Sequence, residues 1–360
     1  MVEILEVDRE GERVGIMSIG KDEDTKEGHA ADGLNQDSVE VDEVTIKNEG
    51  GYAFIVNMLD VKVDLPISLT PTLRLEAATE QQIAEMKGLL VLGGLSIDYY
   101  YEHEWILVEN SEVRTVHRAE LLPRNRWRYY VICWSGEPSE LVTFKQAGNL
   151  IEPGILCYSE VYTSGQFGTG QHMGRKFESV SIPDGYFAIP IEPIVVDSET
   201  IKEWRSALSA LAALDKGTHP GISRAVETLE RFNRLPLSAE LRVLGYFIVL
   251  EMLLTHNPKD KEIGDSLSHQ ICSKVALLDS RLAKPLDYSV FGRDAKVEGI
   301  WKKLYAFRSM IAHGEVPDFG KILKSLQDAK VATAFLANAT ARILRHALNE
   351  PVLFDSLKPV

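Results

Sequence analysis

The chain has 360 residues, of which 45% are hydrophobic and 26% charged, and its 39 basic and 53 acidic side chains give a formal net charge of -14. These proportions are typical of folded globular proteins and exclude wholesale disorder. The longest apolar run, residues 244–254, contains Glu251 and is shorter than the roughly 18 residues of a membrane span. Because the acidic N-terminus also lacks a signal-peptide pattern, we expect a cytoplasmic protein without membrane contacts.

At about 100–200 residues per domain, this length predicts two domains. The two parts of the chain differ in the sign of their charge. Residues 1–200 carry 16 basic and 35 acidic side chains, whereas residues 201–360 carry 23 basic and 18 acidic ones. A polyanion such as RNA would therefore be repelled by the first part and tolerated by the second.

The first part, residues 1–195, is predicted to be a mixed, mostly β domain. Thr79 followed by Gln82 forms a capping-box pattern ahead of a single clear helix, residues 80–92. Around this helix, apolar runs and alternating patterns predict strands at residues 38–47, 52–58, 105–109, 127–134, 155–163 and 179–189.

The second part, residues 196–360, is predicted to be entirely helical. Ser198 and Ser238 mark the starts of two helices. Apolar stripes at helical spacing predict helices over residues 201–214, 222–232, 239–255, 263–282, 297–313 and 322–348. Helices of this length joined by short turns favour an antiparallel bundle. The whole chain is therefore expected to be an α+β multidomain protein, with a β-rich domain followed by an all-α bundle.

The cysteines predict neither disulfides nor a metal site. Cys133, Cys157 and Cys272 lie far apart and form no CxxC pair. This spacing does not offer the ligands of a zinc site, and isolated cysteines in such a chain are most often buried thiols. We therefore expect three buried thiols and no metal or other cofactor.

The segment with the clearest chemical content runs from Leu304 to Gly314 (LYAFRSMIAHG) and places Arg308 and His313 five residues apart at the end of a helix. Five residues correspond to about 140° of helical rotation, so the two side chains do not share one face. They can converge only if the last turn unwinds or if a second copy of the helix supplies the partner. A histidine can transfer protons and an arginine can bind a phosphate. Taken alone, the pair also fits a solvated arginine and a histidine bonded to the helix-end carbonyls.

The context of this pair resembles the HEPN superfamily. The segment YAFRSMIAHG, in the penultimate long helix, is most similar to the Apea-like branch, whose hallmark is a tyrosine, then Arg-Ser, then His-Gly. The upstream element Leu250-Glu251-Met252-Leu253 is similar to the Leu-Glu-x-Leu element of that branch, and Ser273-Lys274 occupies a position that is polar or basic in the family. The resemblance covers about residues 200–350, and residues 1–195 resemble no family that we know.

The resemblance implies a specific activity. Catalytic HEPN proteins are metal-independent endoribonucleases in which the Arg-x4–6-His motifs of two protomers meet across a dimer interface. The 2′-hydroxyl of the RNA attacks the adjacent phosphodiester and leaves a 2′,3′-cyclic phosphate. Carried over to this chain, Arg308 would stabilise the phosphorane and His313 would act as general acid or base. Many catalytic members of the superfamily have Asn, Asp or His directly after the arginine, whereas this chain has Ser309, which is common in the Apea-like branch.

Two further residues are candidates for supporting this pair. Glu251 lies on an otherwise apolar helix, where it either pairs with Arg308 or sits at the solvent edge. Tyr305 precedes Arg308 by three residues and so lies beside it on the helix, where it either bonds a phosphate or serves as a core or interface aromatic.

The resemblance also implies partners and leaves an alternative function open. The implied partners are RNA, either single-stranded or tRNA, and a second copy bound through the helical domain, in a toxin-like or anti-phage role. The acidic N-terminal domain would then sense a regulatory ligand or protein, or restrain the nuclease. In the alternative, the helical domain is a non-catalytic HEPN module for dimerisation, ligand binding or RNA binding. Two other segments, residues 124–128 with their mixed cations and aromatics and the Gly-rich residues 164–174, are more simply explained as a half-exposed strand and a surface loop.

Overall fold

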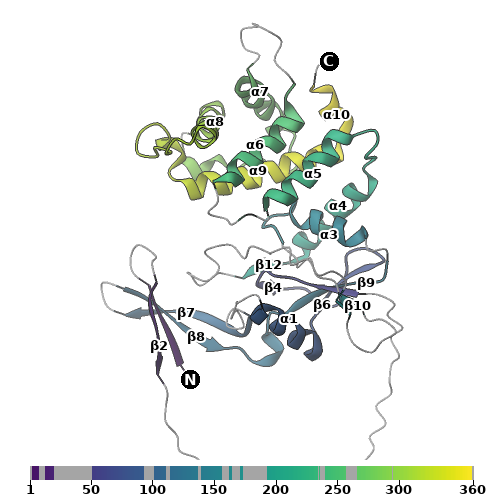
Figure 1. The fold of residues 1–360 in the computed structure, drawn as a ribbon, viewed down its shortest axis with the longest axis vertical. Helices are drawn as coiled ribbons and strands as arrows, with labels where there is room; N and C mark the ends of the chain where they lie inside the picture. Colours follow the sequence, from purple (N-terminus) through teal and green to yellow (C-terminus); the bar gives the residue numbers. More distant parts are fainter. Residues whose placement is uncertain are drawn as a thin grey trace, which may run out of the picture.

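The fold is a mixed α+β arrangement, with sheets in the first part of the chain and helices in the second (Figure 1). A computed structural model describes residues 2–7, 13–19, 51–92, 101–110, 114–136, 139–155, 162–163, 171–172, 193–233, 235, 240–256, 266–293 and 295–358. The expected α+β class is confirmed. The strands predicted at residues 38–47 and 179–189, the residue Cys157 and nearly all of residues 164–174 lie outside the described ranges.

The described strands form two antiparallel sheets and one parallel pair. The larger sheet has the order β11 (Gln171–His172), β10 (Tyr162–Thr163), β3 (Gly51–Phe54), β9 (Tyr130–Trp134), β6 (Leu73–Ala77) and β5 (Ile67–Ser68). The second sheet has the order β2 (Arg13–Ile19), β1 (Val2–Val7), β8 (Arg114–Leu121) and β7 (His103–Asn110). Finally, β12 (Ile194–Val196) pairs in parallel with β4 (Leu59–Val61) and leads the chain into the helices.

The larger sheet is covered on both faces. Successive side chains along a strand point to opposite sides, so each strand contributes residues to both faces. Ile132 and Trp134 belong to the hydrophobic core shared with the helices. On the opposite face, the hydroxyl of Tyr52 bonds the Glu85 carboxylate of α1 (Glu80–Leu92). The predicted capping box at the start of α1 is confirmed: Gln82 N donates to Thr79 Oγ1 at 3.3 Å, and Thr79 N donates to Gln82 Oε1 at 2.9 Å.

The helices after residue 196 match most of the predicted segments. They are α4 (Ser198–Ala213), α5 (Pro220–Asn233), α6 (Leu241–Leu254), α7 (Leu267–Asp279), α8 (Val297–His313), α9 (Ala329–Asn349) and α10 (Pro351–Ser356). The prediction of α8 is confirmed at both ends. Among the described helices, none is both long and apolar enough to cross a membrane.

Several helix boundaries in the second part of the chain differ from the predicted ones; α7, for example, ends at Asp279 instead of residue 282. Ser198 is not the cap of α4: Asp197 precedes it and accepts a hydrogen bond from Thr200 N at 2.9 Å, which is the role of an N-cap side chain. The helix predicted from residue 322 begins only at Ala329, because Asp328 caps it by accepting from Val331 N at 2.8 Å. The third helix begins at Leu241, and Ser238 lies outside the described ranges.

One hydrophobic core extends from the larger sheet into the helices. Helix α3 (Ser139–Gly148), which was not predicted from the sequence, supplies the link between them. It packs against α4, with Phe144 lying 5.0 Å from Trp204 between ring centroids. In the helical part, α6 lies at the centre, where it contacts α5, α7, α8 and α9 (Figure 1). This position places Glu251 of α6 beside α8.

Candidate functional site

The candidate site is built on α8, which packs one face against the core. Ile300, Leu304 and Phe307 recur at helical spacing and are buried. This orientation fixes the rotation of the helix, so that Arg308, the residue after Phe307, lies at the edge of the packed face and is half-buried.

Arg308 is held by side chains from two helices. Its Nη2 lies 3.4 Å from Oε1 of Glu251 on α6, and the two side chains are 27% and 19% exposed. The guanidinium carbon lies 5.6 Å from the centre of the Tyr305 ring, a cation–π distance. Tyr305 itself packs edge-on against Phe247 of α6, at 5.6 Å between ring centroids. Of the two alternatives for Glu251, pairing with Arg308 is the one found.

The ion pair between Glu251 and Arg308 leaves polar atoms of both side chains without a hydrogen bond in the described ranges. Burial raises the pKa of Glu251 above its ordinary value, and the charge of Arg308 offsets part of this effect. Within the described part of the chain, Glu251 Oε1 and Arg308 Nε are buried and make no hydrogen bond. Burial also raises the pKa of Tyr305, so its hydroxyl stays protonated at neutral pH and can donate a hydrogen bond. The three groups therefore retain hydrogen-bonding capacity.

His313 is the last residue of α8 and is exposed. The helix ends in a Schellman motif: Gly314 has a left-handed φ of 71°, Gly314 N donates to Ile311 O at 3.1 Å, and Glu315 N donates to Met310 O at 2.9 Å. The last turn therefore stays wound, and Arg308 and His313 remain on different faces of one helix. Ser309 lies beside Arg308 and is half-buried.

Lys274 of α7, which the family resemblance places at a polar-basic position, has a structural role. Its Nζ donates to the carbonyl of Leu254 at the end of α6 and to that of Leu357 after α10, both at 2.7 Å. The lysine thus satisfies carbonyls at two helix ends.

The other candidates from the sequence do not join the site. Arg124 stacks on Trp127 at 3.7 Å and pairs with Glu80, while Arg128 donates to the carbonyl of His103 at 3.1 Å. This cluster is therefore already satisfied by the protein itself. The thiol of Cys272 is buried and that of Cys133 is half-buried. In the described ranges, no group of three or more acidic, histidine or cysteine side chains is placed to hold a metal ion.

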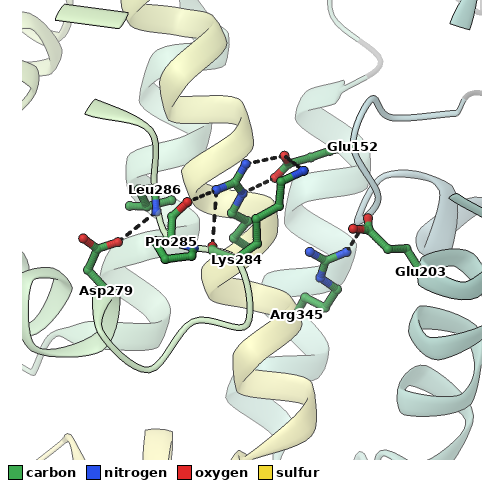
Figure 2. A network of polar contacts seen from close by, with 8 residues as sticks. Glu152, Glu203, Asp279, Lys284, Pro285, Leu286 and Arg345 are labelled. Carbon is green, nitrogen blue, oxygen red and sulfur yellow. Dashed lines mark hydrogen bonds and ion pairs between the residues drawn. The ribbon is translucent and has the colours of Figure 1, made fainter. Parts of the chain in front are cut away.

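The sequence analysis missed a second cluster of charges, which Figure 2 shows along α9. Arg342 pairs with Glu152, which follows α3, and Arg345 donates from Nη1 to Oε2 of Glu203 on α4 at 3.0 Å. No short motif marks these residues, because the two pairs join positions 190 and 142 residues apart in the sequence. The sequence signal is weak: two arginines three residues apart among the largely buried residues of the C-terminal half of α9.

The chain was also compared with known proteins. No protein-family model, curated protein or solved structure matches it. The function must therefore be argued from the residues and geometry described above.

Proposed function

We propose that this protein is a metal-independent endoribonuclease of the HEPN type that acts as a homodimer. One observation carries the proposal: Arg308 is held against α6 by Glu251, while His313 is exposed at the end of the same regular helix. In this proposal, α4 to α9 form the HEPN bundle, and the Apea-like signature occupies the last turns of α8.

The chemistry assigns one role to each residue. The 2′-hydroxyl attacks the neighbouring phosphorus, the bond to the 5′-oxygen of the next nucleotide breaks, and the products are a 2′,3′-cyclic phosphate and a 5′-hydroxyl end. His313 moves the proton, either from the attacking 2′-hydroxyl or to the leaving 5′-oxygen. Arg308 stays charged and stabilises the negative charge that develops on the phosphorane oxygens. Tyr305 and Ser309 are hydroxyl donors beside it.

In the proposed dimer, Arg308 and His313 from different copies can reach the same phosphate. Because Arg308 and His313 project about 140° apart on α8, one protomer cannot close both side chains on a single phosphate. Two α8 helices lying side by side bring Arg308 of one copy to His313 of the other. Met310 and Ile311 on the same turns are only partly buried, which leaves apolar surface for such a helix contact.

The charge of the first part of the chain favours a restraining role. Residues 1–200 carry 35 acidic and 16 basic side chains, so they repel RNA and lower its concentration near the helical part. We therefore propose a toxin-like or anti-phage ribonuclease that cleaves single-stranded RNA or tRNA. A ligand or protein that binds the first part would regulate it.

A second candidate function is a non-catalytic HEPN module for dimerisation or binding. The observation that favours it is that Arg308 already has protein partners, since both the Glu251 carboxylate and the Tyr305 ring contact it. A purely structural arginine would show the same contacts.

The test compares wild-type protein with the Arg308→Ala and His313→Ala variants, each incubated with tRNA and total RNA in EDTA. Exposed residues elsewhere provide matched controls: Arg293→Ala and His269→Ala remove the same side chains away from the site. The proposal predicts that wild type and both controls cleave RNA and leave cyclic-phosphate ends, whereas the two site variants do not.

Two outcomes would contradict the nuclease. Persistent cleavage by a rigorously purified His313→Ala protein would assign the activity elsewhere. A monomer by light scattering at micromolar concentration would remove the partner helix on which the mechanism depends. If wild type, site variants and controls all form dimers but leave RNA intact, the module is the better description.

A further inference from the structure

A second polar site lies along the C-terminal half of α9 and shares no residue with the Arg308 pair. The short loop after α7 and the C-terminal half of α9 border a cavity with about 40 Å³ open to water-sized molecules. By this measure a single water needs about 10–15 Å³, so the cavity has room for about three waters or for one small oxyanion. It is lined by Leu282, Ala283, Lys284, Arg342, Arg345, His346 and Asn349.

Most of the polar lining of the cavity comes from one face of α9. Arg342 is followed at three, four and seven residues by Arg345, His346 and Asn349, which is the spacing of side chains on one helix face. Three of the lining residues carry a positive charge, and none carries a carboxylate. Lys284 completes the set from the opposing loop, and its side chain is 57% exposed.

Arg342 lines the cavity, and hydrogen bonds hold its guanidinium in place. Its Nε and Nη2 bond the two oxygens of the Glu152 carboxylate, and Nη1 donates to the carbonyls of Lys284, at 3.3 Å, and of Pro285 (Figure 2). These bonds use most of its five donors. They hold the loop against α9 and set the position of the cation, whose side chain is 9% exposed.

Arg345 and Lys284 have hydrogen-bond donors that are not used within the described structure. Among the described residues, Arg345 makes one side-chain hydrogen bond, from Nη1 to Glu203 at 3.0 Å, out of the five that a guanidinium can donate. Lys284 Nζ lies 3.8 Å from Glu152 Oε2, which is an ion-pair distance but too long for a hydrogen bond. Both groups can therefore donate to a further acceptor.

Acids lie around the cavity but do not line it. Glu152 and Glu203 pair with its three basic residues, and Asp287 acts electrostatically on Arg342. Glu350 is paired with Arg281 at 3.1 Å. Because none of these carboxylates lines the cavity, an anion bound there would meet donors rather than acids.

We propose that this cavity binds one phosphate group, carried either by inorganic phosphate or by a nucleotide. A tetrahedral oxyanion matches donors that converge from a guanidinium, an ammonium and the Asn349 amide, and bidentate arginine contacts favour phosphate oxygens. The proposal does not depend on the nuclease, because it shares no residue with the Arg308 site. Since Glu152 follows α3 in the first part of the chain, the ligand binds where the sheet-bearing and helical parts meet.

The test is isothermal titration of full-length protein with inorganic phosphate, with AMP and with adenosine, in a phosphate-free buffer of low ionic strength. We expect one site per chain. Lys284→Gln and Arg345→Gln should each weaken binding by about 10-fold or more, the effect of losing a hydrogen bond to a charged group. Lys284→Arg should retain binding, because it keeps the charge and the donors. Since Lys284 is exposed, its variants should fold normally.

Arg281→Gln is the matched control. Arg281 is one residue before the lining of the cavity and is 50% exposed, so its loss removes the same charge without removing a cavity donor. Tighter binding of AMP than of inorganic phosphate, with no binding of adenosine, would identify a nucleotide phosphate, whereas the reverse preference would identify the free ion. The proposal is wrong if wild type binds neither at millimolar concentration, or if Arg281→Gln weakens binding as much as Lys284→Gln.

Discussion

The ion pair between Glu152 and Arg342 offers the sharpest test of how the two parts of the chain are joined. The two side chains are only 10% and 9% exposed, so their charges are largely removed from water. Glu152→Gln keeps the shape of the side chain but removes the negative charge that is hydrogen-bonded to the buried Arg342 cation. Breaking a buried pair in this way typically costs about 3–5 kcal/mol. Because glutamine retains one oxygen acceptor for Arg342, we expect a loss near the lower end, about 3 kcal/mol.

The cost should depend on the presence of the arginine. In a double-mutant cycle with Arg342→Met, Glu152→Gln should cost at least about 1 kcal/mol less than it does alone, since no buried cation is left. Arg342→Met remains destabilising by itself, because the carbonyls of Lys284 and Pro285 lose their donor. The coupling energy therefore isolates the ion pair from the loop contacts.

Urea unfolding followed by circular dichroism measures these differences. The matched control is Glu298→Gln, which breaks an exposed pair with Lys302 on α8 and should change the midpoint little. The reasoning is refuted if Glu152→Gln is no more harmful than this control, or if the effects of Glu152→Gln and Arg342→Met simply add.

Three further predictions concern stability and are measured in the same way. Gly148→Ala should lower the free energy of unfolding by about 2 kcal/mol or more, since the new Cβ would lie 2.2 Å from the backbone oxygen of Ile155. Its control, Gly88→Ala, meets no atom within 4 Å and should be neutral or stabilising. Equal effects of the two substitutions would contradict this prediction. Thr340→Val should stabilise by about 1 kcal/mol, because it removes a fully buried hydroxyl without a partner in the described structure, and a loss would show that the hydroxyl is satisfied. Burial raises the pKa of Glu251 above 4.5 in the folded state, so the folded protein holds this proton more tightly than the unfolded chain. The free energy of unfolding of wild type relative to Glu251→Gln should therefore fall as the pH rises from 4.5 to neutral. A rise over this range would contradict the raised pKa.

Local signals in the sequence predicted the parts of the fold that depend on local chemistry. The reciprocal bonds of Thr79 and Gln82 and both ends of α8 follow from capping residues and apolar spacing, which act within one or two turns. Glu251 was also recognised as a candidate partner of Arg308, because a carboxylate on an apolar helix needs a cation.

Features that depend on distant partners were not predicted. Strand β8 was missed because its charged residues obscure the alternation, and α3 was missed because its few apolar residues gain meaning only against α4. The start of α9 was placed too early, since the apolar residues Leu323 and Leu326 are buried in a turn and a short 3₁₀ helix (Lys324–Leu326) that precede α9. The cavity on α9 could not be found from the sequence, because the pair of Glu152 and Arg342 closes a separation of 190 residues.

The packing of α3 on α4 limits how the helical part can be released from the rest of the chain. Trp204 has no exposed surface while Phe144 covers it, and Arg342 is neutralised by Glu152. A protease cut near residue 195 followed by loss of the N-terminal fragment would therefore leave a bare tryptophan and an unpaired arginine on the surviving piece. Such a fragment should aggregate rather than act as a liberated enzyme. If the N-terminal part restrains the nuclease as proposed, that control would have to operate while the chain is intact, through changes transmitted across this contact.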